Sequence, residues 1–112
     1  TLQEIISSTI ENYLTFVDRS NAHCHHKIII QGVPSPNLKI KNYAGEDINH
    51  LTGVIRVFNE LLRLKSEKLG FQFLDVYKLT DRGDGLSSGM WHIDEHHLSP
   101  EGVLEAWKNY LT

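Results

Sequence analysis

Apolar residues recur every three or four positions in the first part of the chain. They fall at Ile5, Ile6, Ile10, Tyr13, Leu14 and Val17. This spacing places them on one face of a helix with 3.6 residues per turn. We therefore predict an amphipathic helix that begins at Leu2 and ends between residues 18 and 22. A second, longer helix is predicted from residues 45–47 to 69, because a stripe of the same period runs along it and Gly70 follows as a C-terminal cap.

Two short segments have the composition of buried strands. Residues 27–33 contain three consecutive isoleucines, and residues 71–76 are rich in phenylalanine, leucine and valine. Continuous apolar runs of this kind are typical of strands that are covered on both faces in a parallel sheet. With the long helix between them, the two segments form a βαβ unit, whose crossover is expected to be right-handed. We predict an α/β fold with a short parallel sheet.

The last helix is predicted to begin after Ser99 and to run to the end of the chain. Ser99 is a good N-cap residue, and Pro100 suits the first helical position, where its missing N–H costs nothing. Residues 80–89, with three glycines and several charges, are predicted to form a loop that leads toward this helix. The final helix therefore anchors whatever the preceding residues carry.

Two strands are too few for the burial that the isoleucines require. Ile28 to Ile30 call for neighbours on either side, which a two-stranded sheet does not supply. We expect the missing strands to come from a preceding segment or from a second copy of the chain. The sequence also begins at Thr1, inside a helical pattern and without an initiator methionine, which we interpret as a processed product or an excised piece.

Composition narrows the function classes. With 112 residues, 40% hydrophobic and 22% charged, the chain is expected to form a single globular domain spanning residues 1–112. No apolar run is long enough to cross a bilayer, so no membrane partner is expected. A formal net charge of −3 with scattered lysines gives no reason to expect nucleic acid. The single cysteine, Cys24, excludes an internal disulfide and indicates no compartment.

The reactive side chains gather between Trp91 and Ser99, which enclose three histidines and two acidic residues ahead of the last helix. Asp94 and His97 are three residues apart, a spacing that can bring a carboxylate against an imidazole N–H. Such a contact fixes the tautomer of the imidazole and makes its other nitrogen more basic. The alternative is structural: Asp94 caps a turn, and His97 fills a gap beneath the helix.

The pattern Asp94-x-x-His97-Leu98-x-Pro100-x-Gly102 resembles the final motif block of the SGNH (GDSL-type) superfamily of esterases and acylhydrolases. Two upstream segments agree with it. Residues 27–34 are similar to the family's strand that ends in a Gly-x-Pro loop, and residues 73–77 are similar to its last strand. The resemblance covers nearly the whole chain, but only the second half of the family's fold. It implies that residues 1–112 are the C-terminal part of a flavodoxin-like, three-layer α/β/α sandwich.

The resemblance also implies a reaction and site residues. His97 would be the general base for a serine nucleophile that attacks a small-molecule ester or acyl substrate, Asp94 would orient it, and no cofactor would be needed. The family's Gly-Asp-Ser block and Gly-x-Asn-Asp block do not occur in this sequence. We therefore expect an incomplete site and an inactive isolated chain. Trp91 and Asn37 are candidates for the substrate-binding surface, although a tryptophan beside such a loop is more often a packing residue.

Two other classes of function stay open. His92, Asp94 and His96, or the cluster at residues 23–26, offer side chains of the kind that bind zinc or nickel. Their spacing matches no metal-binding motif, so we expect no metal. A non-catalytic assembly module is the other alternative, because an unpaired sheet edge can recruit a second copy, making a homo-oligomer, or another partner.

Overall fold

The helix α2 (Gly45–Lys68) connects two parallel strands, β1 (Ile29–Gln31) and β2 (Gln72–Leu74), in a computed structural model that describes residues 1–112. The strands pair with Ile30 opposite Phe73. The remaining elements are α1 (Leu2–Asn21), a 3₁₀ turn η1 (Ile40–Asn42), α3 (Val76–Thr80) and α4 (Pro100–Leu111). The α/β class, the three long helices and the parallel βαβ unit predicted from the sequence are therefore confirmed.

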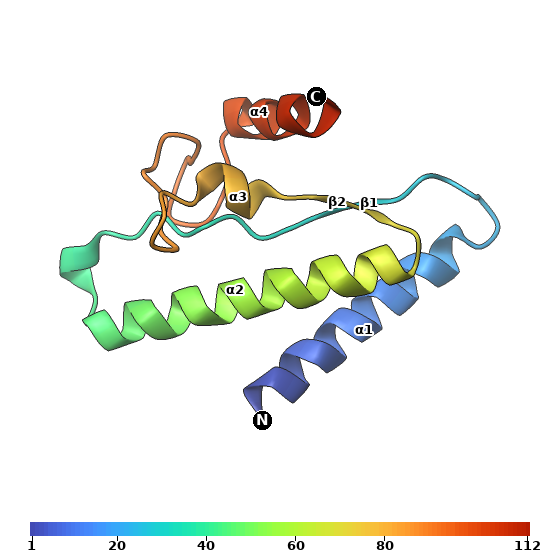
Figure 1. Cartoon of the computed structure of the whole chain (residues 1–112), viewed down its shortest axis with the longest axis horizontal. Helices are drawn as coiled ribbons and strands as arrows, with labels where there is room; N and C mark the ends of the chain where they lie inside the picture. The colour runs from blue at the N-terminus through green and yellow to red at the C-terminus, as the bar shows by residue number, and fades with distance from the viewer.

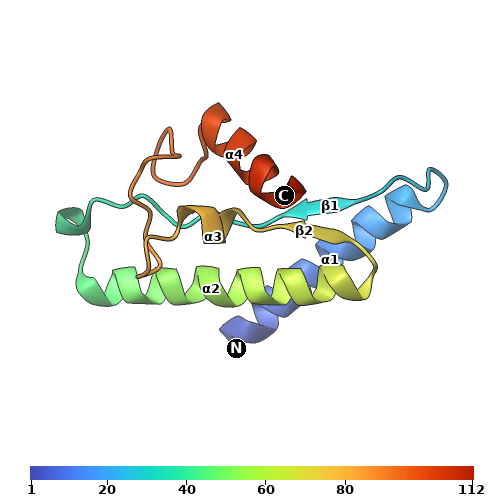
Figure 2. The ribbon, with the colours of Figure 1, turned by 45° about the horizontal axis from the view of Figure 1, so that its top comes forward.

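Helices lie on both faces of this small sheet (Figures 1 and 2). On one face, Ile30 and Phe73 pack into a core that α1 and α2 supply, with Ile10, Leu14 and Leu62 among its buried members. On the other face, Ile29 and Leu74 pack against Ala106, Trp107 and Tyr110 of α4. Neighbouring isoleucines of β1 thus point to opposite faces, which explains why the strand is apolar throughout rather than alternating.

The helix ends follow the capping signals in the sequence. Thr1 and Glu4 form a reciprocal capping box at the start of α1. After α2, Gly70 adopts a positive φ of 79°, its N–H donates to the Glu67 carbonyl at 3.0 Å, and the Phe71 N–H donates to the Ser66 carbonyl at 3.0 Å. These two bonds form a Schellman motif, which ends the helix and directs the chain into β2. The hydroxyl of Ser99 caps α4, as predicted.

Three sequence expectations require correction. Each strand has only three residues, shorter than the predicted segments. The chain leaves β2 at Asp75, whose carboxylate accepts the Lys78 N–H at 2.9 Å and caps the short helix α3, which was not predicted. Leu69 and Leu111 are 45% and 77% exposed, although the spacing of apolar residues along the second and last helices predicts that both lie on the inner faces. Both lie at helix ends, which extend past the area that a two-stranded sheet covers.

Each strand has a neighbour on one side only, because the sheet consists of β1 and β2 alone. The N–H of Gln72 donates to the Ile28 carbonyl and that of Gly32 to the Leu74 carbonyl, so residues 28, 30 and 32 face β2. The backbone groups of Ile29 and Gln31 point toward the open edge of β1, since successive residues of a strand alternate in direction. The isoleucines of β1 led us to expect a neighbouring strand on either side of it. This chain supplies only one of the two.

The surface of α1 continues this uncovered region. Ile5 and Phe16 are 64% and 70% exposed, although the adjacent positions Ile6, Ile10 and Leu14 are buried. The apolar arc of α1 is therefore wider than the part that α2 and β1 cover. No helix has the combination of length and apolar character that crossing a bilayer requires.

Candidate functional site

A small hairpin carries Asp94 and His97. It is closed by an antiparallel bridge between residues 92 and 98 and by the Ser99 N–H, which donates to the Trp91 carbonyl at 2.7 Å. The helix α4 begins directly afterwards, and its first turn packs against the hairpin. A Cβ added to Gly102 would lie only 2.7 Å from the Trp91 carbonyl oxygen, so glycine permits this close approach. The turn is thereby attached to a rigid helix.

Asp94 organises the turn by accepting several hydrogen bonds. Its Oδ1 accepts the backbone N–H of His96 at 2.8 Å and that of His97 at 2.7 Å. Its Oδ2 lies 2.8 Å from Nδ1 of His97. These hydrogen bonds lower the pKa of Asp94 to about 2. The His96 N–H has the largest effect, followed by the N–H of His97 and then its imidazole. The carboxylate is therefore ionised at neutral pH, and it favours a proton on Nδ1 of His97.

The predicted contact between Asp94 and His97 is confirmed, and so is one part of the structural alternative. Asp94 does cap a turn. His97 does not fill a gap beneath the helix, since its side chain is 75% exposed and that of Asp94 is 52% exposed. With Nδ1 directed at the carboxylate, Nε2 is left without a hydrogen-bond partner in the chain. A carboxylate therefore orients one ring nitrogen of His97 while the other is left free to accept or donate a proton.

The hairpin lies at the carboxyl ends of the strands. Residues 33–37 leave the end of β1, and the Asn37 N–H donates to the Glu95 carbonyl at 2.7 Å. Tyr43 donates from its hydroxyl to the Glu95 carboxylate at 2.9 Å. Figure 1 shows the orange loop before α4 next to the segment that leaves β1. Crevices at the carboxyl ends of parallel strands are where α/β folds place their ligands.

The two candidate substrate-binding residues have different surroundings. Asn37 is brought to the hairpin by its backbone bond to Glu95, and its side chain lies against Gly89, where an added Cβ would come 3.0 Å from the Asn37 Oδ1. Trp91 is half-buried and packs on Gly102 at the start of α4. Trp91 therefore has the surroundings of a packing residue. The side-chain amide of Asn37 makes no hydrogen bond and lies beside the loop at Gly89.

No serine hydroxyl of the chain is hydrogen-bonded to His97. Ser99 caps α4 through Gly102, and Ser87 lies 3.0 Å from Nδ1 of His92 instead. Ser35 is fully buried against Thr80. The serines at positions 7, 8 and 20 lie on α1, which packs on α2 rather than on the hairpin. The site therefore contains a carboxylate and an imidazole in contact, and no nucleophile next to them.

The other histidines do not join this pair. His92 is directed at Ser87, and His96 contributes its backbone N–H, but no side-chain hydrogen bond, to the turn. The histidines and the cysteine at residues 23–26 are exposed in the connection between α1 and β1. The chain contains no group of three or more His, Cys, Asp or Glu side chains arranged to hold a metal ion. The ligand sets considered from the sequence are therefore not assembled.

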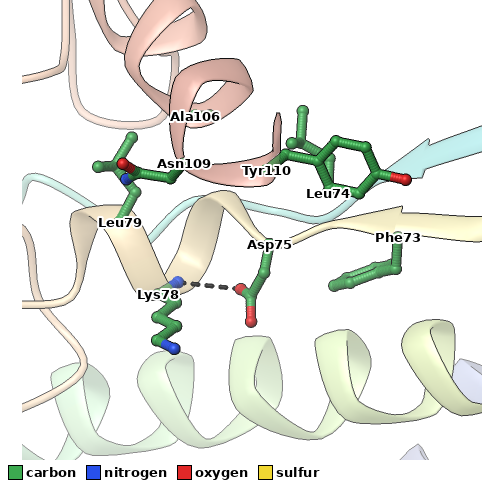
Figure 3. A pocket seen from close by; sticks show the side chains of 8 residues that line it. All are labelled: Phe73, Leu74, Asp75, Lys78, Leu79, Ala106, Asn109 and Tyr110. Carbon is green, nitrogen blue, oxygen red and sulfur yellow. Dashed lines mark hydrogen bonds between the residues drawn. The ribbon is translucent and has the colours of Figure 1, made fainter. Parts of the chain in front are cut away.

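The largest cavity is separate from the Asp94–His97 pair. It runs along the open edge of β2, between α3 and α4, and Figure 3 shows its lining. The lining residues are Phe73, Leu74, Asp75, Lys78, Leu79, Ala106, Asn109 and Tyr110. Asp75 contributes one carboxylate oxygen to the N-terminal cap of α3, the dashed contact in Figure 3. This cavity marks the second unpaired edge of the sheet.

Sequence reasoning missed the polar residues that hold the segment after β1. Asn59 of α2 accepts the Val33 N–H at 2.8 Å and donates to the Val33 carbonyl at 2.9 Å. Thr80 accepts the Ser35 N–H at 2.9 Å. The one signal in the sequence that could have identified Asn59 is its position. It lies on the apolar face of the long helix, directly after Phe58, where the helical period predicts a buried side chain.

No family model, no curated protein and no solved structure was found to match this chain.

Proposed function

We propose that residues 1–112 form the C-terminal part of an SGNH-type serine ester hydrolase and supply the Asp–His half of its catalytic triad. The observation that carries this proposal is the 2.8 Å contact between Asp94 Oδ2 and His97 Nδ1, on a hairpin that exposes the rest of the imidazole. The motif Asp94-x-x-His97-Leu98-x-Pro100-x-Gly102 supports it independently. One observation is geometric and the other is a sequence pattern.

In the proposed reaction, Nε2 of His97 removes the proton from a serine hydroxyl as the serine oxygen attacks the carbonyl carbon of a small-molecule ester. The imidazolium formed is stabilised by Asp94, which stays ionised. It then gives its proton to the leaving alkoxide, and a water molecule releases the acyl group by the same steps. The serine and the donors that stabilise the oxyanion come from outside these 112 residues. No cofactor takes part.

The proposed whole fold is a flavodoxin-like sandwich in which further parallel strands continue the sheet from β1. The open edge of β1 at Ile29 and Gln31 and the uncovered apolar side chains Ile5 and Phe16 on α1 support this arrangement. A strand added there would end beside residues 33–37. A loop following that strand could therefore reach His97, which is where the proposed nucleophile is needed.

Ester hydrolysis by the isolated chain tests the incompleteness of the site. Residues 1–112 are assayed with short p-nitrophenyl esters beside the His97→Ala and His96→Ala variants. We expect all three proteins to show the same low background, because exposed histidines alone hydrolyse such esters slowly. Catalytic turnover by the wild-type chain that His97→Ala abolishes and His96→Ala preserves would contradict the proposal, since it would show a complete site.

A second candidate is a non-catalytic assembly module, favoured by the two unpaired edges of the sheet. In this case copies of the chain associate through an edge strand. Sedimentation equilibrium of the purified chain distinguishes the candidates. A tight dimer that persists in the His97→Ala variant supports assembly, and a monomer over the whole concentration range argues against it.

A further inference from the structure

We propose that His92 is the positioning residue of the hairpin: its half-buried imidazole bonds to Ser87 and fastens the Asp94–His97 turn to the end of β1. This inference depends on the proposed function in one respect, namely that Asp94 and His97 are the catalytic pair. The anchoring itself is a property of this chain.

Ser87 is in contact with His92. Ser87 is 6% exposed, its Oγ lies 3.0 Å from Nδ1 of His92, and the same Oγ accepts the Gly89 N–H at 3.0 Å. Because the oxygen already accepts from Gly89, its own proton is available for Nδ1. The His92 N–H donates to the Gly89 carbonyl at 3.2 Å and closes the turn from the other side.

The surroundings of His92 favour one tautomer of its imidazole. Its Nε2 is buried and has no hydrogen bond of good geometry, yet the Ser35 carbonyl is close enough to raise the pKa of His92 against the larger, lowering effect of burial. The Ser87 hydroxyl can donate to a bare Nδ1, which leaves the proton of the neutral imidazole on Nε2. The neutral imidazole with its proton on Nε2 therefore suits the contact with Ser87 better than the other tautomer does.

Ser87 connects His92 to the segment that leaves β1. Ser87 also donates its backbone N–H to the Pro36 carbonyl at 2.9 Å. Ser35 is held by Thr80 at 2.9 Å, and Thr80 donates its hydroxyl to the Val76 carbonyl at 2.8 Å. The segment after β1 is thus bonded to α3 through Thr80 and to the loop before the hairpin through Ser87, which in turn contacts His92. Because the His92 side chain bonds to this network, it determines where the Asp94–His97 turn lies.

His92 and His96 differ in burial and in hydrogen bonding. Both residues are histidines within two positions of Asp94. His92 is half-buried with a bonded ring nitrogen, while His96 is exposed and its side chain makes no hydrogen bond. The charges that act on His92 are those of Asp94, which raises its pKa, and His96, which lowers it. Replacing His96 therefore removes a histidine from the same turn without removing an anchor.

Nuclear magnetic resonance of the chain tests the proposal without any enzyme activity. Long-range ¹H–¹⁵N spectra near neutral pH identify the tautomer of each histidine, and amide hydrogen exchange reports how firmly the turn is closed. We expect His92 to carry its proton on Nε2. In His92→Leu we expect the His96 and His97 amides to exchange about tenfold faster or more, the size of one lost hydrogen bond, while amides in the middle of α2 keep their protection.

Matched variants complete the experiment. His92→Asn keeps an acceptor near the position of Nδ1 and is expected to restore part of the protection, while His96→Leu is expected to leave it unchanged. Unaltered exchange of the turn in His92→Leu, an equal loss of protection in α2, or a proton on Nδ1 of His92 overturns the proposal. None of these outcomes depends on a serine elsewhere, so failure of the anchor and failure of the proposed hydrolase are distinguishable.

Discussion

His97 and Asp94 are joined twice, once through the backbone and once through the side chain. The carboxylate accepts the His97 N–H at 2.7 Å and lies 2.8 Å from the Nδ1 of the same residue. A single acidic side chain therefore sets both the turn and the orientation of the imidazole. Because the backbone bonds pre-form the turn, the exposed pair does not depend on burial to stay together.

Acid is expected to open this turn at a lower pH than an ordinary aspartate would allow. The folded pKa of Asp94 is lowered to about 2, below its ordinary value. A lowered carboxyl pKa contributes stability that is present above the unfolded pKa, declines as the pH falls below it, and is lost once the pH has passed the folded pKa. The Asp94 carboxyl ¹³C shift and the His96 and His97 amide shifts, followed from about pH 6 to about pH 1.5, should move together with a midpoint near 2.

The variant Asp94→Asn provides the control for this titration. It is expected to remove the acid transition of the His96 and His97 amides while leaving the amides of α2 unaffected. If the midpoint for the wild-type chain were about 4, the pKa of a free aspartate, the backbone hydrogen bonds to Asp94 would not persist in solution.

A methyl group at Gly32 is expected to destabilise the fold. The added Cβ would lie 2.8 Å from Asn59 Oδ1 and 2.8 Å from Cζ of Phe73, both of which are fixed by their own packing or bonds. Overpacking of this kind costs about 1 to 3 kcal/mol. Urea denaturation of Gly32→Ala should show a lower midpoint with an unchanged slope.

Gly53→Ala is the matched control for Gly32→Ala. Gly53 lies inside α2 with no atom within 4 Å of the added methyl group. Alanine in a helix interior is better than glycine by about 0.5 to 1 kcal/mol, so this variant should be more stable than the wild type. Effects of the same sign at both positions would contradict the packing described for the end of β1.

Loss of the Asn59 amide is expected to release the segment that leaves β1. In Asn59→Leu, the N–H and the carbonyl of Val33 lose their partners at 2.8 and 2.9 Å. Leaving such partly buried groups unsatisfied costs about 1 to 3 kcal/mol in total. The free energy of unfolding measures the effect, with Asn12→Leu on the exposed face of α1 as the control. Equal stabilities of the two variants would show that the amide contributes no more than a surface residue.

Local patterns predicted the parts of the structure that depend on residues close in sequence. The long helices, their caps at Ser99 and Gly70, and the Asp94–His97 contact three residues apart all follow from spacing. The α/β class could be predicted because two continuous apolar segments that flank a helix are compatible with few other folds.

Contacts between distant residues could not be predicted in this way. Asn59 and Val33 are 26 positions apart, and Ser35 and Thr80 are 45 apart. Nothing in their local sequence indicates that they meet. The short helix α3 was missed for a different reason: its five residues show no full apolar period, and only the cap at Asp75 marks its beginning. The anchor at His92 belongs to the same class, since it depends on how the loop folds onto the end of β1.

Fluorophosphonate labelling of the full gene product, expressed with whatever coding sequence precedes Thr1, tests the central claim most directly. The probe reacts covalently with serines that a general base activates, and peptide mass spectrometry locates the adduct. We expect the adduct on a serine outside residues 1–112, with labelling lost in His97→Ala and retained in His96→Ala. An adduct within these 112 residues, or labelling that His97→Ala leaves unchanged, would contradict the claim that Asp94 and His97 are the base half of a serine hydrolase.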